Sequence, residues 1–136
     1  MPVEQFEQGV ILQVTVPANQ PANSLLTANI VLDPQLGGVN LVTIPNNEAW
    51  VIEDVFVTAS QSIDAILVFK KGLKDEVART PPINTLLVSN PSRPRIRPIL
   101  YKANEMLSIN AINLQAGGSA ATTLTVYMKV RRFVAK

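Results

Sequence analysis

The stretch TLTVYMKVR, residues 123–131, alternates apolar and polar positions without a break. Its even-numbered residues are leucine, valine, methionine and valine, while the odd-numbered ones are threonine, tyrosine, lysine and arginine. Successive side chains of a β-strand project to opposite faces, so this pattern predicts a strand with one buried face and one solvated face. Extended over residues 121–133, it would span about 40 Å at ~3.3 Å per residue. We therefore expect a sheet that runs the full height of the domain.

Outward from this stretch, the chain repeats strand-length apolar runs that end at Pro, Gly or Asn, and no stretch has a helical stripe. The expected strands cover residues 10–16, 25–32, 39–44, 50–60, 65–70, 73–80, 83–89, 99–101 and 106–114. We predict an all-β, two-sheet antiparallel sandwich, a single jelly roll of about eight strands. A true immunoglobulin domain would need a Cys-Trp-Cys spacing that this chain lacks. One domain covers residues 1–136, with residues 1–8 as a short N-terminal extension.

The composition favours a protein that assembles with other subunits over one that catalyses a reaction. Of the 136 residues, 47% are apolar and 16% are charged, against about 25% charged in average proteins. A small sandwich exposes a large surface, so we expect part of it to be buried against other subunits. The alternative is a surface made polar by Asn, Gln, Ser and Thr. The N-terminus lacks a signal-peptide pattern and no apolar run reaches ~20 residues, so we expect a soluble chain without a transmembrane segment.

Catalytic chemistry has few candidates in this sequence. The chain holds no His and no Cys, which removes the commonest general base and the usual zinc ligands. Glu53 and Asp54 are adjacent acids, but neighbours on a regular strand project to opposite faces and cannot share one substrate. We predict no enzyme activity, no catalytic residue, no metal site and no cofactor. A carboxylate-dependent hydrolase is the third hypothesis for function, and it would need two acids facing one cleft.

Charge divides the chain into two halves. Residues 1–88 contain four cations and nine acids, whereas residues 89–136 contain eight cations and one acid. Such a division favours contact between the acidic half of one subunit and the basic half of the next. One alternative is that the basic half binds a nucleic acid or another polyanion, although few aromatic residues accompany its arginines. A second alternative is that these charges form a solvated edge without a partner. The candidate contact residues are Arg93, Arg95, Arg97, Arg131, Arg132, Glu53 and Asp54.

Two aromatic residues are candidates for different roles. Trp50 begins a run that is apolar on both faces, so we expect it in the core or at a sheet end rather than on a sugar-binding platform. The same two-sided pattern predicts a central strand covered on both sides. Tyr127 lies on the polar face of residues 123–131, so we expect it to be an exposed contact residue.

Three segments resemble a known family. Residues 44–55, IPNNEAWVIEDV, look like the turn and strand of small jelly-roll virion proteins, and residues 104–111, NEMLSINA, with 123–127, TLTVY, resemble their closing hairpin. The pattern over most of the chain is similar to the single jelly-roll capsid proteins of tailless icosahedral viruses. This resemblance implies a virion protein made in the host cytoplasm, which assembles with copies of itself, with or without a second capsid protein, into capsomers of an icosahedral shell. It implies no catalysis and no cofactor.

A second interpretation of the sequence is a binding module. Phage head-decoration and fibre domains use similar sandwiches, so the alternative function is a glycan- or protein-binding β-sandwich on a phage or virus particle. An exposed Trp50 or Tyr127 in a groove would favour this alternative.

Overall fold

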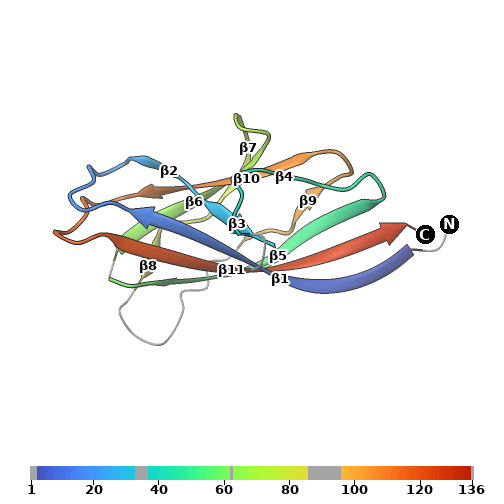
Figure 1. Cartoon of the computed structure of the whole chain (residues 1–136), viewed down its shortest axis with the longest axis horizontal. Coiled ribbons are helices and arrows are strands. Elements are labelled where there is room, and N and C mark those ends of the chain that lie inside the picture. Colours follow the sequence, from blue (N-terminus) through green and yellow to red (C-terminus); the bar gives the residue numbers. More distant parts are fainter. Residues whose placement is uncertain (1–2, 33–36, 62, 86–95, 136) are drawn as a thin grey trace.

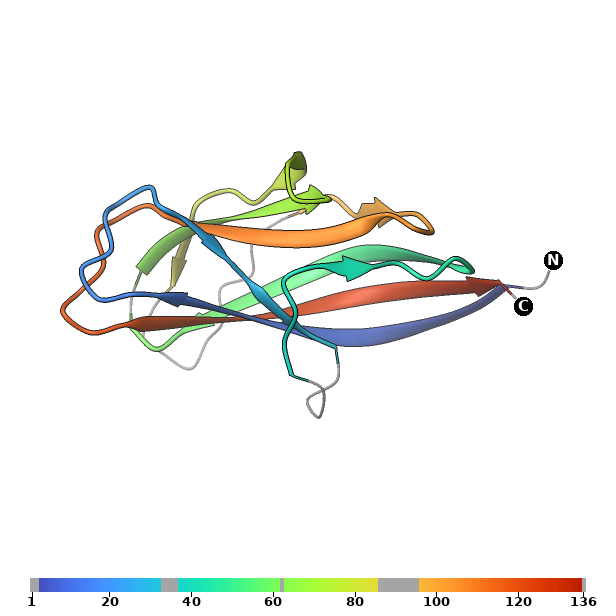
Figure 2. The same ribbon diagram turned by 45° about the horizontal axis from the view of Figure 1, so that its top comes forward.

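A computed structural model describes residues 3–32, 37–61, 63–85 and 96–135. These residues form two antiparallel sheets packed face to face, without a helix (Figures 1 and 2). The first sheet contains, in spatial order, β3 (Asn29–Val31), β1 (Val3–Val16), β11 (Thr122–Ala135), β5 (Glu48–Ala59) and β9 (Ile99–Tyr101). The second contains β2 (Leu25–Thr27), β10 (Met106–Asn113), β6 (Ile63–Lys71) and β7 (Asp75–Arg79), with β4 (Val42–Thr43) beside β10 and β8 (Ile83–Thr85) beside β6. The predicted sandwich is confirmed.

Eight of these strands pair as one long hairpin that has been rolled up. In chain order they are β1, β2, β5, β6, β7, β9, β10 and β11. The first pairs with the eighth, the second with the seventh, the third with the sixth and the fourth with the fifth. The β11–β5 pair then joins the first and third of these strand pairs into one sheet, and the β10–β6 pair joins the second and fourth into the other. This is jelly-roll topology, as the alternation of short apolar runs predicts.

One predicted strand is divided between the two sheets. Residues 25–32 form β2 in the second sheet and β3 in the first, so the chain crosses between layers at Ala28. Ala28 is fully buried, and its N–H donates a hydrogen bond of 3.0 Å to the carbonyl of Ile109. A small side chain fits at this corner, where the chain passes through the apolar layer between the sheets.

The predicted N-terminal extension also differs from the structure. Residues 3–8 of this expected extension belong to β1. This strand pairs with β11 from Val3 opposite Ala135 to Val16 opposite Thr122. We call residues 3–8 of β1 together with residues 130–135 of β11 the terminal ribbon. It extends beyond the second sheet, and both termini lie at its end (Figure 2). The segment is a strand because β11 continues far enough to give every residue of β1 a partner.

The core lies between the two sheets and follows the two-residue period. All four apolar residues at even positions from 124 to 130 are fully buried, as the opening stretch predicts. They pack with Val10, Leu12 and Val14 of β1 and with Leu67, Phe69, Leu107 and Ile109 of the second sheet. Burial of this continuous apolar layer stabilises the sandwich by about 25 cal/mol for each Å² removed from water. The rigid core thereby fixes which side chains of the first sheet face outward.

Candidate interaction surfaces

A row of apolar side chains crosses the outer face of the first sheet, which the second sheet does not cover. Tyr127 of β11 lies opposite Ile11 of β1 and Phe56 of β5, and Ile11 lies opposite Val31 of β3. Tyr127 is 48% exposed and Ile11 is 38% exposed. We call these four residues the apolar row. The expectation that Tyr127 faces away from the core is confirmed, and the row adds three residues that sequence patterning did not single out.

Gly9 determines how Tyr127 lies on this face. A Cβ atom at Gly9 would be 2.2 Å from the Tyr127 hydroxyl oxygen and 2.5 Å from two of its ring carbons. The tyrosine ring therefore lies across β1, in space that only glycine leaves open. On its other side the ring packs against Phe56, with the ring centroids 6.3 Å apart and the planes tilted by 53°. The result is an aromatic surface held against the sheet rather than a freely rotating side chain.

Four charged residues form a cluster next to the apolar row. We call Glu7, Glu53, Lys129 and Arg131 the charged cluster. Arg131 Nη2 donates a hydrogen bond of 3.3 Å to Glu53 Oε2, while its Nε lies 2.8 Å from Oε1 but is not aligned for a hydrogen bond. Lys129 Nζ lies 3.3 Å from Glu7 Oε1 and 3.7 Å from Glu53 Oε2. The acidic and basic halves of the sequence thus meet within one chain. Contact of Glu53 or Arg131 with a neighbouring subunit stays a prediction.

A β-bulge places Glu53 and Asp54 on the same face of the sheet. Ile52 and Val55 are both fully buried, although a regular strand would turn residues three apart to opposite faces. The register between β5 and β11 shifts between Lys129 and Val130, so that Asp54 lies opposite Lys129 and Ile52 opposite Val130. The expectation that these two acids project to opposite faces is therefore wrong. The extra residue is invisible to a pattern that assumes unbroken alternation.

Arg132 lies on the inward face of the terminal ribbon. Its guanidinium carbon is 4.9 Å from the ring centroid of Phe6 and 5.0 Å from that of Trp50. Its Nε donates a hydrogen bond of 2.7 Å to Glu48, and its Nη1 donates one of 2.6 Å to Gln8. Trp50 is 3% exposed and donates its indole N–H to the same Glu48 oxygen at 3.1 Å. The predicted core role of Trp50 is confirmed, and Arg132 contacts partners of its own chain.

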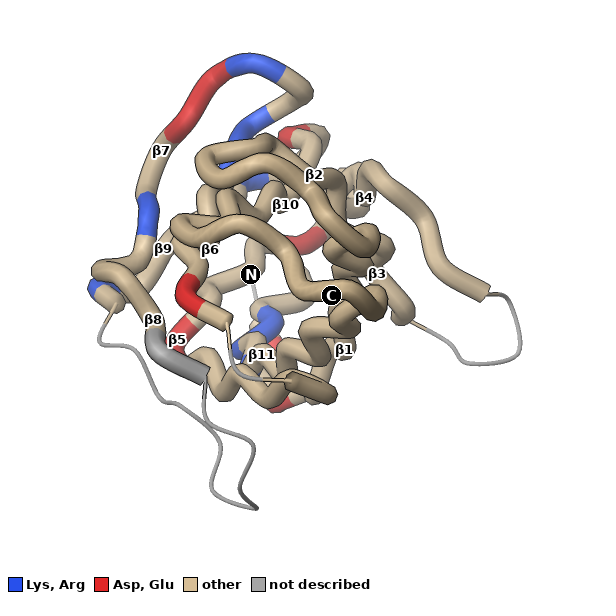
Figure 3. The backbone as a smooth tube through the Cα atoms, turned by 90° about the vertical axis from the view of Figure 1, so that its left-hand side faces the viewer, with Lys and Arg blue, Asp and Glu red and all other residues tan. Residues whose placement is uncertain are grey.

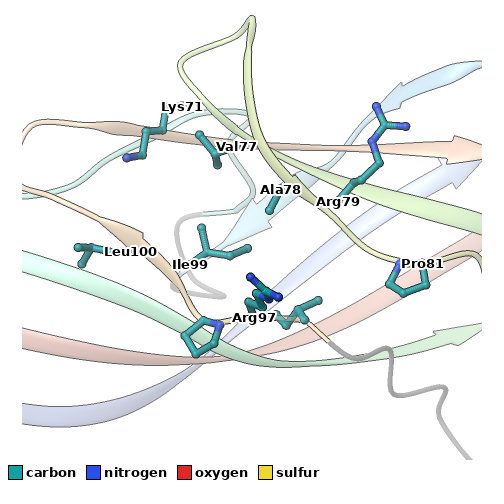
Figure 4. A pocket seen from close by; sticks show the side chains of 10 residues that line it. Lys71, Val77, Ala78, Arg79, Pro81, Arg97, Ile99 and Leu100 are labelled. Atoms are coloured by element: carbon teal, nitrogen blue, oxygen red, sulfur yellow. The ribbon is translucent and has the colours of Figure 1, made fainter.

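A cleft lies between β7 and β9, where the edges of the two sheets face each other. Its volume is about 590 Å³. Figure 4 shows the side chains that line it. The described residues that line it include Lys71, Arg79 and Arg97 but no acid. The rest of the lining is Val77, Ala78, Pro81, Ile96, Pro98, Ile99 and Leu100. Arg97 is exposed, and within the described ranges the structure gives it no ion pair. Arg93 and Arg95 lie outside the described residues.

Acids close to the cleft pair with two of its cations. Lys71 Nζ lies 3.0 Å from Glu105 Oε2, and Arg79 Nη2 lies 2.6 Å from Glu76 Oε1. The Lys102 backbone N–H and the Lys71 ammonium hold the pKa of Glu105 below its ordinary value. These pairs neutralise only part of the local charge. Figure 3 shows charged segments on the β7 hairpin and also near β5, β6 and β11, whereas β2 and β3 carry none.

The part of the chain that the structure describes shows no group of acids placed to hold a metal ion. Since the cleft lining contains no described carboxylate, it does not supply the two acids of the hydrolase hypothesis. Within the same ranges, no helix has the length and apolar character required to cross a membrane.

Comparisons with known proteins leave the family open. No protein-family model matches the chain, and no curated protein matches it. Among solved structures, the N-terminal cellulose-binding domain of Cellulomonas fimi β-1,4-glucanase C is 12% identical, with 87% of this chain and 86% of that chain covered and a TM-score of 0.35. The CBM22-1–GH10 modules of Clostridium thermocellum xylanase 10B are 11% identical, with 91% of this chain and 26% of that chain covered and a TM-score of 0.30. Both similarities are too distant to inform the function of this chain.

Proposed function

We propose that this chain is a virion structural protein, a jelly-roll subunit that packs beside copies of itself to form capsomers of an icosahedral shell. The observation that carries the proposal is exposed apolar side chains on both lateral sides of the sandwich. Leu25 of β2 and Val39, which bridges to β3, lie on one side, and Val77 of β7 and Leu100 of β9 lie on the other. Contiguous exposed apolar surface marks places that partners cover, and in this proposal these residues belong to two such surfaces.

The two lateral sides are unlike each other, which favours one kind of assembly. A contact between unlike surfaces is heterologous, so it produces closed rings when the rotation closes and extended arrays when it does not. Capsomers are rings of this kind. The two sides also differ in polarity, because β7 carries Asp75, Glu76 and Arg79 while β2 and β3 carry no charged residue (Figure 3). The proposed location is accordingly the virion.

Sedimentation velocity tests this proposal over a range of protein and salt concentrations, with electron microscopy of the fastest species. We expect concentration-dependent association and ring-shaped particles. Replacing Leu25 or Leu100 with Gln should weaken association. Ile11→Gln makes the same apolar-to-polar change on the outer face and should leave association intact. A strict monomer at high protein concentration, in both low and high salt, would contradict the proposal.

The apolar row favours a second candidate function, a glycan-binding module. Tyr127 lies across Gly9 beside Phe56, and about half of its side chain is exposed. The adjacent charged cluster offers carboxylates, an ammonium and a guanidinium that could hydrogen-bond sugar hydroxyls. An aromatic surface with polar groups beside it is the usual composition of a site that orients a small ligand.

A glycan array followed by titration of the best ligand tests this second function. We expect Tyr127→Ala to abolish binding, and Leu100→Ala, which removes a similar apolar area from a different side, to leave it unchanged. An array without signal, or a ligand that binds Tyr127→Ala equally well, would contradict a glycan site on this face.

A further inference from the structure

The cleft between β7 and β9 stays open because both strands lie at the edges of their sheets. Within the described ranges, β9 pairs only with β5 in the first sheet, and β7 pairs only with β6 in the second. Pro81 lines the cleft after β7 and Pro98 lines it before β9. Neither proline has a backbone N–H, so neither can donate a hydrogen bond toward the facing sheet.

A β-bulge in β7 shapes one wall of the cleft. Ala78 lies opposite Phe69 of β6 and Glu76 lies opposite Lys70, so Val77 is an extra residue between them. Val77 and Ala78 both line the cleft, although adjacent residues of a regular strand point to opposite faces. The bulge thus adds an apolar side chain to this wall.

Arg97 lies on the other wall, in a run of five consecutive residues, 96–100, that all line the cleft. Figure 4 shows its side chain among the apolar lining residues, whereas the Arg79 side chain extends away from it. In the part of the chain that the structure describes, the Arg97 side chain makes no ion pair, hydrogen bond or ring contact. Its guanidinium therefore has all five N–H donors free for a ligand.

The other two cations of the lining are already paired with acids outside it. Arg79 donates hydrogen bonds of 2.7 Å and 2.6 Å to the two carboxylate oxygens of Glu76. Lys71 Nζ lies 3.0 Å from Glu105 Oε2. These two pairs leave the charge of Arg97 uncompensated within the described cleft. One unpaired cation favours a ligand with one negative charge, because a polyanion needs several cations to neutralise its phosphates.

We propose that this cleft binds a small amphipathic monoanion, a carboxylate attached to an apolar chain. The carboxylate accepts two hydrogen bonds from the Arg97 guanidinium, a pairing in which the planar shapes of the two groups match. The apolar chain lies against Val77, Ala78 and Leu100. The cleft volume of about 590 Å³ is within the range of about 300–1,000 Å³ that is usual for small-ligand sites.

This inference does not rest on the proposed self-assembly. Val77 and Leu100 also belong to one of the two lateral sides that neighbours cover in that proposal. A ligand and a neighbouring subunit would therefore compete for the same surface. Binding is accordingly measured at a protein concentration at which sedimentation velocity shows a monomer.

Nuclear magnetic resonance titration with octanoate, below its micelle concentration, tests the site. We expect saturable shifts of backbone amide signals in residues 75–79 and 96–101. Octanol lacks the charge, octylammonium reverses it and acetate lacks the apolar chain, so each should bind at least about tenfold more weakly. Decanoate should bind more tightly than octanoate, by up to about fourfold for each added methylene group. Shifts centred on β2, or equal binding of octanoate and octylammonium, would contradict the inference.

Three variants separate the role of Arg97 from that of net charge. Arg97→Gln should weaken octanoate binding at least about tenfold and leave the denaturation midpoint unchanged, because its side chain has no partner in the described structure. Lys74→Gln removes the same charge outside the cleft lining and should bind octanoate as the unaltered protein does. Val77→Glu adds a carboxylate to the facing wall and should weaken binding as much as Arg97→Gln. If octanoate does not bind, or binds Arg97→Gln and Lys74→Gln equally well, the inference is wrong and self-assembly is unaffected.

Discussion

The body of the sandwich and the terminal ribbon are built from the same strands and are stabilised differently. In the body, the inward residues of β1 are Val10, Leu12 and Val14, all buried beneath the second sheet. The terminal ribbon extends beyond the second sheet, and its inward face carries Gln8 and Arg132 in a hydrogen-bonded group with Glu48. The comparison teaches that one alternating pattern supports a strand with or without a covering layer, while the side chains on the inward face show which of the two is present.

The largest effect is expected in the body. Leu12→Ala leaves a cavity in the core, so the free energy of unfolding should fall by about 2–5 kcal/mol. Ile11→Ala, the adjacent residue on the outer face, should cost less than about 1 kcal/mol because it leaves no enclosed cavity. Urea denaturation measures both variants. Equal losses would mean that the body has no distinct inner face, which would break the comparison.

The next largest effect is expected in the terminal ribbon. Arg132→Met keeps an apolar side chain between Phe6 and Trp50 but leaves the Glu48 carboxylate, whose side chain is only 9% exposed, without its cation. We expect a loss of about 1.5–3 kcal/mol in the free energy of unfolding. Arg79→Met, which breaks an exposed pair with Glu76, should leave the denaturation midpoint unchanged. If the two variants behave alike, polar contacts do not stabilise the ribbon.

A smaller effect links the body to its outer face through Gly9 and Tyr127. Gly9→Ala must displace the tyrosine ring, so it should destabilise the unaltered protein more than it destabilises a Tyr127→Ala background. The difference between the two losses, measured as a double-mutant cycle, should be about 0.5–1.5 kcal/mol. A coupling of zero would show that the ring does not rest on β1.

The smallest effect concerns pH and the exposed pairs at the rim of the body. Hydrogen bonds from Lys102 and Lys71 lower the pKa of Glu105 from its ordinary value of 4.5. A lowered folded-state pKa means that the stabilisation is complete above pH 4.5 and is lost as the pH falls through the folded value. Glu105→Gln should therefore be slightly less stable than the unaltered protein at pH 7, and the gap should close in strong acid. A gap that widens on acidification would contradict this assignment.

The fold followed from the sequence because side-chain alternation is a local property. Residues 123–131 predicted a half-buried strand, and the jelly roll followed from the number and spacing of similar runs. The residues of the candidate interaction surface could be predicted only in part. Tyr127 could be placed on the outer face, but its neighbours Ile11 and Phe56 depend on strand register, which the chain specifies only through long-range pairing.

Two features went against local expectation, both for tertiary reasons. The bulge at Glu53 and Asp54 inserts one residue against β11 and reverses the face of everything after it. The segment before Gly9 became part of β1 because β11 extends to Ala135 and pairs with it. Both features depend on pairing with β11, which cannot be predicted from the sequence of β5 or of residues 3–8 alone.

The sequence by itself determined that this protein is a β-sandwich with a period-two core and without the His and Cys residues that many catalytic sites use. The tertiary structure decided which charges meet, where the first sheet stays open and which aromatic rings lie on its surface. The physical reason is one of range. Burial preference acts on each residue separately, whereas ion pairs, sheet edges and ring contacts form only after strands far apart in the chain have been brought together.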